Sequence, residues 1–75
     1  MNIIKLISNN EKEIIWSFLP EGENKEGKIS LTKETDKAVI LENVGPMRYG
    51  LKALDCIEKF WKDSILPDHY VQAWY

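Results

Sequence analysis

The hydrophobic period of the chain changes at Gly45-Pro46, and this change limits the folds that are open to it. Before this point, apolar residues recur with the period of two that is typical of strands. After it they recur at steps of three and four residues, as in a helix. The apolar stripe of this segment consists of Gly50, Ala53, Leu54, Ile57, Trp61 and Ile65. Proline suits the first helical turn, where its missing N–H is not needed, so the pattern predicts one amphipathic helix over residues 46–65.

Four segments before this helix and one after it have the composition of strands. They cover residues 2–8, 12–19, 28–32, 37–44 and 69–75, although a short helix is an alternative for the last. The polar, glycine-containing residues 20–27 predict an exposed loop. Four strands, a helix and a strand predict a two-layer α+β domain, in which one helix covers one face of a small, mostly antiparallel sheet.

The length and the cysteine content narrow the class of protein further. A chain of 75 residues has room for one core, so we expect residues 1–75 to form a single domain. Cys56 is the only cysteine and cannot form an internal disulfide, which favours a cytoplasmic setting. No apolar run approaches the ~20 residues of a membrane span, and the first residues do not resemble a signal peptide.

Alternation within the first two strands predicts which of their side chains meet the helix, because directly opposed residues of an antiparallel pair point to the same face. A three-residue loop at residues 9–11 sets Leu6 opposite Ile14 and Ile4 opposite Trp16. This register is preferred because it gathers large apolar side chains on one face. They are Ile4, Leu6, Ile14, Trp16 and Phe18.

The same reasoning extends to the remaining strands. A three-residue loop at residues 34–36 sets Leu31 opposite Val39 and Ile29 opposite Leu41. The residues added to the helix-covered face are Ile29, Leu31, Val39, Leu41, Val71 and Ala73. The other face is then expected to hold Ile3, Lys5, Ile7, Ile15, Ser17, Leu19, Ala38, Ile40, Glu42, Val44, Tyr70, Gln72 and Trp74.

This second face has no cover, because a single helix shields only one side of the sheet. Monomers seldom expose apolar patches beyond a few hundred Å², and one small core gives marginal stability. We therefore expect the face to bind a protein, either a second copy in a homodimer or a different partner. The residues expected to make the contact are Ile15, Leu19, Ile40, Tyr70, Trp74 and Tyr75.

The charges of the chain argue against nucleic acid as the main partner. The formal net charge is −2, from 10 basic and 12 acidic residues, and the lysines are scattered among acidic neighbours. A protein that follows a phosphate backbone usually carries a basic stripe. Stacking of single-stranded bases on Tyr70 and Trp74 is retained as an alternative. The acidic loop 20–27 would instead fit a basic surface on a protein partner.

No segment of the sequence contains a recognisable catalytic, phosphate-binding or metal-binding motif. Cys56 and His69 are too few for a zinc site, and we expect no metal and no cofactor. An enzyme would need a site at the seam of a dimer, near His69 and Tyr49. The start of the helix offers free N–H groups, so Arg48 and Tyr49 are candidate contacts for an anion.

The sequence therefore predicts a small non-catalytic interaction module. Such a chain would serve as an inhibitor, an immunity-like or antitoxin-like factor, a phage or bacterial accessory protein, or a subunit of a larger assembly. It would act by placing a rigid sheet face against its partner.

Overall fold

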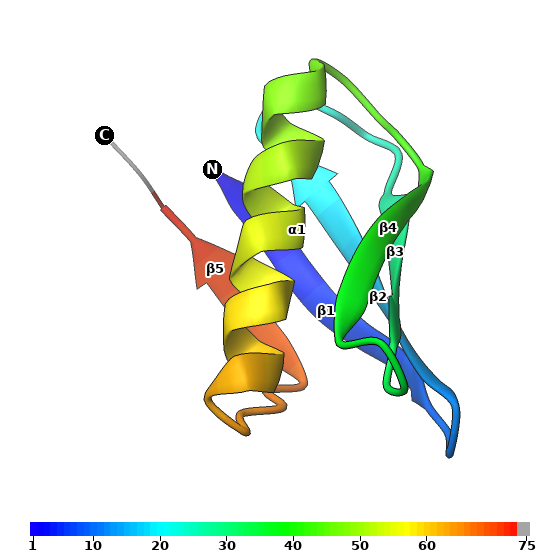
Figure 1. Cartoon of the computed structure of the whole chain (residues 1–75). Coiled ribbons are helices and arrows are strands. Elements are labelled where there is room, and N and C mark those ends of the chain that lie inside the picture. The colour runs from blue at the N-terminus through cyan, green and yellow to red at the C-terminus, as the bar shows by residue number, and fades with distance from the viewer. Residues whose placement is uncertain (74–75) are drawn as a thin grey trace.

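The computed structural model describes residues 1–73, and its five strands form one antiparallel sheet in the order β4-β3-β2-β1-β5 (Figure 1). One helix lies across a single face of this sheet, so the predicted two-layer α+β architecture and its element order are confirmed. The elements are β1 Asn2–Asn9, β2 Glu13–Pro20, β3 Gly27–Thr32, β4 Lys37–Glu42, α1 Met47–Lys62 and β5 His69–Gln72. No helix of the described part is long and apolar enough to cross a membrane.

The helix α1 begins after Pro46 and ends earlier than its apolar pattern predicts. Ser64 adopts a left-handed conformation with φ of 58°. Its N–H donates to the carbonyl of Trp61, and the N–H of Ile65 donates to the carbonyl of Phe60 at 2.8 Å. These two bonds satisfy carbonyls at the helix end and stop the helix there. Ile65 therefore lies beyond α1 and is exposed.

We call the face of the sheet beneath α1 the inner face and the opposite one the outer face. The core lies between α1 and the inner face, and the first hairpin contributes the apolar side chains that were predicted for it. The fully or nearly buried hydrophobic residues are Ile4, Ile14, Trp16, Phe18, Ile29, Leu31, Ala38, Ala53, Ile57 and Phe60. Burial of this set is the main stabilising contribution to the fold.

The register of the first hairpin differs from the predicted one without changing its faces. Leu6 lies opposite Trp16 and not opposite Ile14, and the pairing shifts again between Leu6 and Ser8. The shift marks a bulge at Ile7, whose side chain is exposed. Because the difference from the prediction is two residues, every side chain before the bulge keeps its face.

The register of the second hairpin was predicted wrongly, and here the faces are exchanged. Leu31 lies opposite Ala38 and not opposite Val39, a difference of one residue. The connecting turn has four residues, because Asp36 adopts φ of 60° and its N–H donates to the carbonyl of Thr32. A one-residue change turns a whole strand over, so Ala38 belongs to the inner face and Val39 to the outer face.

Ile40 likewise faces the core, in contrast to the prediction, because it lies opposite the buried Ile29. Leu41 was expected beneath the helix, but it lies at a second irregularity of the pairing, beside Glu42, and its side chain is exposed. The edge strand β4 therefore carries a bulge of its own.

The faces of β5 are also the reverse of those predicted. Tyr70 lies opposite Ile4 and Gln72 lies opposite Asn2, so both belong to the inner face, and Val71 belongs to the outer face. The physical reason is the contact with α1. The Tyr70 ring packs edge-on against Phe60 at 5.0 Å between centroids, and Gln72 Nε2 donates to the Lys52 carbonyl.

Candidate functional site

The outer face carries a row of three apolar side chains across neighbouring strands. Ile3 on β1 lies opposite Leu19 on β2 and opposite Val71 on β5. Ile3 and Leu19 are partly exposed, and Val71 is 48% exposed. We call Leu19, Ile3 and Val71 the apolar row. No helix covers it in the described part of the chain.

A polar row runs beside the apolar row across the whole sheet. The register places its members side by side from β4 to β5, and they are Glu42, Lys28, Ser17, Lys5 and His69. Ser17 is buried, and its hydroxyl donates to Glu26 Oε2 at 3.0 Å. Lys5 and Lys28 flank this serine and are exposed, so the middle of the outer face presents two ammonium groups.

A third row completes the outer face on the β4 side. Ser30 lies opposite Ile15 and opposite Val39. Ser30 is buried, and its hydroxyl donates to Glu13 Oε2 at 2.9 Å. Ile15 is partly exposed, and Val39 is 53% exposed. Both buried serines are therefore hydrogen-bonded, and the apolar side chains at the sides of the face are the ones left in contact with solvent.

The structure brings together only some of the residues that the sequence proposed for partner contact. Ile15 and Leu19 lie on the outer face as predicted. Ile40 and Tyr70 lie on the inner face, where one packs against the core and the other against Phe60, so their predicted place on the outer face is wrong. Trp74 and Tyr75 lie outside the described residues. Whether Ile15 and Leu19 contact a partner stays a prediction.

Sequence reasoning missed that Lys28 lies beside Ser17, in one row with Lys5. The alternation of residues 28–32 puts Lys28, Ser30 and Thr32 on one side of a strand, but only the register shows which strands flank them. The polar row becomes visible only when all five strands are aligned.

The start of α1, where the sequence proposed an anion contact, is joined to the sheet by the side chain of Asn2. Asn2 is fully buried, and its Nδ2 donates to the carbonyl of Tyr49 and to Gln72 Oε1, at 2.9 and 3.0 Å. The Arg48 guanidinium is exposed and lies 5.2 Å from the centroid of the Tyr49 ring. His69 lies opposite Lys5 on the outer face, whereas α1 carries Tyr49 on the inner side. The structure therefore does not bring His69 and Tyr49 together.

Cys56 lines a small hollow of about 290 Å³ between the second half of α1 and β5. The other lining residues are Lys59, Phe60, Asp63, Ile65, Pro67 and Tyr70. Burial raises the pKa of the Cys56 thiol, and the charge of Lys59 lowers it by a smaller amount. The net shift keeps the thiol protonated at neutral pH, which is the opposite of what an activated nucleophile requires.

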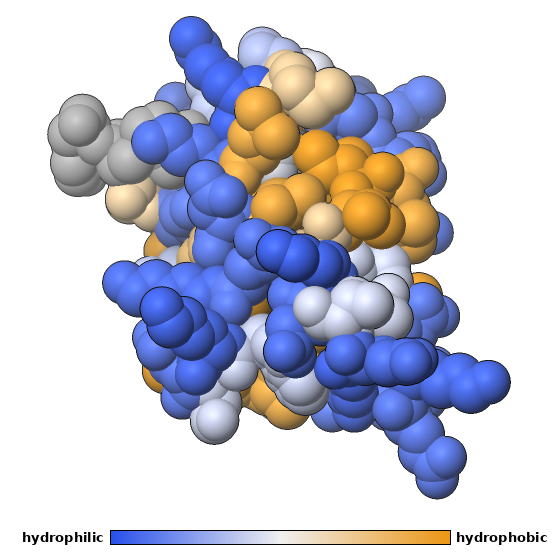
Figure 2. All heavy atoms as spheres, viewed as in Figure 1, coloured by the Kyte–Doolittle hydropathy of each residue, from blue (hydrophilic) through white to orange (hydrophobic). Residues whose placement is uncertain are grey.

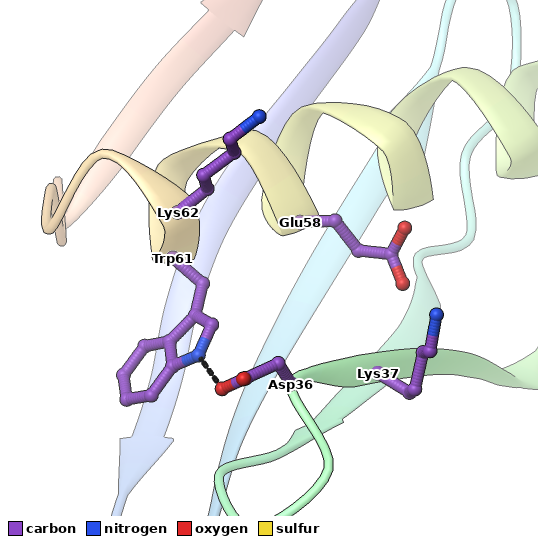
Figure 3. Close-up of a pocket in the computed structure, with 5 residues that line it drawn as sticks. All are labelled: Asp36, Lys37, Glu58, Trp61 and Lys62. Atoms are coloured by element: carbon purple, nitrogen blue, oxygen red, sulfur yellow. Dashed lines mark hydrogen bonds between the residues drawn. The ribbon is translucent and has the colours of Figure 1, made fainter.

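A second hollow, of about 420 Å³, lies between α1 and the start of β4 (Figure 3). Its two carboxylates are used in holding these elements together. Trp61 Nε1 donates to Asp36 Oδ1, and Glu58 Oε2 accepts the backbone N–H of Ala38 at 3.0 Å. Among the described residues, no cluster of three or more His, Cys, Asp or Glu side chains is placed to hold a metal ion.

The helix side of the molecule is mainly hydrophilic, with one apolar patch beside the first half of α1, at the upper right of Figure 2. Met47 and Leu51 are exposed in this half of the helix, and Ile40 and Leu54 are packed against the core. This patch lies at the margin of the core, which α1 and the sheet already enclose, whereas no helix of the described residues covers the outer face.

Comparisons of the chain with protein-family models, with curated proteins and with solved structures found no match. The functional interpretation therefore depends on the surfaces described above.

Proposed function

We propose that the protein is a non-catalytic interaction module that binds a partner protein on the outer face of its sheet. The supporting observation is the uncovered apolar surface there. α1 packs only on the inner face, and Val39 and Val71 are about half exposed on the outer one. Apolar side chains at the centre of a contact lose water on binding, which gives the association its driving force.

The charges of the outer face indicate the chemistry of the partner. Lys5 and Lys28 are exposed beside the apolar row, while the carboxylates of Glu13 and Glu26 accept hydrogen bonds from the buried serines. Glu42 beside Lys28 adds another anion to this face, so a protein surface with apolar side chains bordered by charges of both signs would complement the arrangement. Its charges would mainly speed the encounter and select the partner, and its apolar side chains would supply affinity.

Affinity capture with the full chain as bait tests this proposal. Leu19→Lys places a charge in the apolar row, and the long side chain can reach solvent from its partly exposed position. Leu51→Lys places the same charge on the exposed side of α1 and serves as the matched control. We expect wild type and Leu51→Lys to retain the same protein and Leu19→Lys to lose it. Loss in Leu51→Lys alone would move the docking site to the helix patch.

Neither alternative function gains a supporting contact. Base stacking was expected to use Tyr70, whose ring packs against Phe60 on the inner face. One protomer holds Tyr49 and His69 on opposite sides of the sheet, so an enzyme site at a dimer seam would have to take them from different copies.

A further inference from the structure

The two edge strands of the sheet differ in how their free backbone groups are treated. An edge strand exposes unpaired N–H and C=O groups that can pair with another chain, and proteins block such edges with charges, bulges or covering groups. On β4 the N–H of Ala38 is taken by Glu58 Oε2, a bulge lies at Leu41, and Lys37 and Glu42 stand at the two ends. We call β4 the protected edge.

Among the described residues, β5 carries no charged side chain, bulge or covering group, although it has only four residues, and we call it the open edge. The N–H of Leu6 on β1 donates to the carbonyl of Asp68 at 2.9 Å, in register with the β1–β5 pairing. Because hydrogen-bonded and non-bonded pairs alternate in an antiparallel ladder, Tyr70 also turns its backbone groups toward β1. His69 and Val71 therefore turn theirs away from the sheet, and the described residues provide no strand on that side.

The strand at the open edge is neutral and partly apolar, although Asp68 precedes it and Lys59 and Asp63 line the hollow beside Tyr70. Residues 69–73 contain no Lys, Arg, Asp or Glu. Val71 on the outer face and Tyr70 on the inner face are 48% and 41% exposed, and Ile65 and Leu66, in the segment just before β5, are also exposed. An edge with free hydrogen-bonding groups and apolar flanks on both faces is suited to pairing with another strand.

We propose that β5 pairs antiparallel with β5 of a second copy, around a two-fold axis that passes through Val71 perpendicular to the sheet. In this register Val71 lies opposite Val71 of the second copy, and His69 lies opposite Ala73. The outward-pointing groups of all three residues are then paired on both copies. Centring the axis on Tyr70 would pair only two residues of each copy.

The composition of β5 favours a second copy of the chain as the partner of this edge. A two-fold axis brings identical side chains together, and a neutral strand can tolerate this without repulsion between like charges. The apolar row also continues across the seam, because Leu19, Ile3 and Val71 of one copy meet Val71, Ile3 and Leu19 of the other. The dimer would join two outer faces into one surface. The inference concerns the edge and stands whether or not that surface binds a further protein.

Sedimentation velocity of the full chain at high micromolar concentration tests the pairing. We expect a mass twice the 8.8 kDa of one chain. Val71→Pro removes an N–H that points away from β1, so the ladder inside the protomer is kept. Val71→Lys sets two ammonium groups opposite each other. Each variant should weaken dimerisation by about tenfold or more, which is about 1.4 kcal/mol. Val39→Lys, at an equally exposed position on the protected edge, should leave the mass unchanged.

Hydrogen exchange gives an independent measurement on the unmodified chain. The amides of His69 and Val71 should gain protection as the protein concentration rises. A wild-type monomer, or a dimer that persists in both Val71 variants, would overturn the inference. Leu19→Lys separates it from the proposed function, because this variant should lose the outer-face partner while keeping the paired edge. A dimer lost only in Leu19→Lys would show that the copies meet through their faces instead.

Discussion

The sheet has two edge strands, β4 and β5, and they differ in whether their outward-pointing backbone groups are blocked. On the protected edge, α1 contacts β4 more extensively than any other strand. Glu58 accepts a hydrogen bond from β4, and Trp61 donates one to Asp36 in the turn just before it. On the open edge, β5 is held by the packing of Tyr70 on Phe60 and by the hydrogen bonds of Gln72. If two copies pair through β5 as proposed, the protected edge would keep the sheet from growing further and would limit the assembly to two copies.

The largest expected effect comes from disturbing the protected side. In Gly27→Ala the new Cβ would lie 2.4 Å from the Phe18 ring and 2.6 Å from the Glu42 carbonyl, so strands must move apart. We expect a loss of about 3 kcal/mol in the free energy of unfolding. Urea denaturation measures it. Gly22→Ala is the control, because its Cβ meets nothing within 4 Å. Its φ of 86° should cost about 1 kcal/mol. Equal losses in the two variants would contradict the tight packing at Gly27.

We expect a smaller loss of stability when the main contact between β5 and α1, the packing of Tyr70 on Phe60, is removed. Tyr70→Ala removes the edge-on packing against Phe60, and the side chain is already 41% exposed. We expect a loss of about 1–2 kcal/mol. Because Tyr70 lines the hollow that holds Cys56, the thiol should also react faster with iodoacetamide. Val71→Ala, on the other face of β5, is the control and should leave that rate unchanged. A Tyr70→Ala variant with unaltered reactivity would show that β5 does not shield the thiol.

A substitution of Glu58 tests whether its hydrogen bond to Ala38 is needed to block the β4 edge. Glu58→Ala leaves the N–H of Ala38 without its acceptor, and we expect a loss of about 1 kcal/mol, since the carboxylate is only half buried. The freed edge should also promote association beyond a dimer, which light scattering would detect. Glu58→Gln keeps an acceptor and should behave as wild type. A Glu58→Ala variant that never exceeds the wild-type mass would show that the bulge alone blocks β4.

The smallest effect concerns the ionisation of Cys56. Burial raises the pKa of this thiol, so the fold favours its protonated form. The resulting stabilisation is fully present below the pKa of the unfolded chain and is lost as the pH rises through the folded-state pKa. Unfolding measured against pH should therefore show a decline at alkaline pH that Cys56→Ser lacks. Identical alkaline profiles for the two proteins would contradict the raised pKa.

The sequence was sufficient to predict those elements whose signal is local. The helix followed from its 3.6-residue period, and the faces of the first hairpin followed from large alternating side chains such as Trp16 and Phe18. The register itself was not predictable, because a difference of two residues leaves the faces before the bulge unchanged. The bulge at Ile7 changes the faces only of the last residues of β1, which are polar and give no hydrophobic signal.

The second hairpin could not be predicted because tertiary packing decides its register. Alternation favoured placing the larger Val39 and Leu41 beneath the helix. The fold places Ala38 and Ile40 there, and α1 lies so close that a Cβ on Gly50 would come within 3.1 Å of Ile40 Cδ1. Gly50 has no side chain at this close approach of α1 to β4. The distance between a helix and a sheet cannot be predicted from the local sequence pattern of either element.

The candidate site was half predictable for a related reason. Ile15 and Leu19 lie in a strand with two neighbours, where burial on one face fixes the other. Tyr70 lies in a four-residue edge strand, whose side chains can point either way with similar exposure. The choice depended on Phe60, which lies on α1 and becomes a neighbour of Tyr70 only when β5 folds back against the helix.

The hydrogen bond between Asn2 and Gln72 joins residues 70 positions apart in the chain, so the first strand pairs with the last. Closing a loop of this length costs conformational entropy, and contacts of high sequence separation slow the folding reaction. Until β5 arrives, β1 has β2 on one side and a bare flank on the other. We therefore expect the chain to be prone to aggregation for as long as this flank of β1 is unpaired during folding.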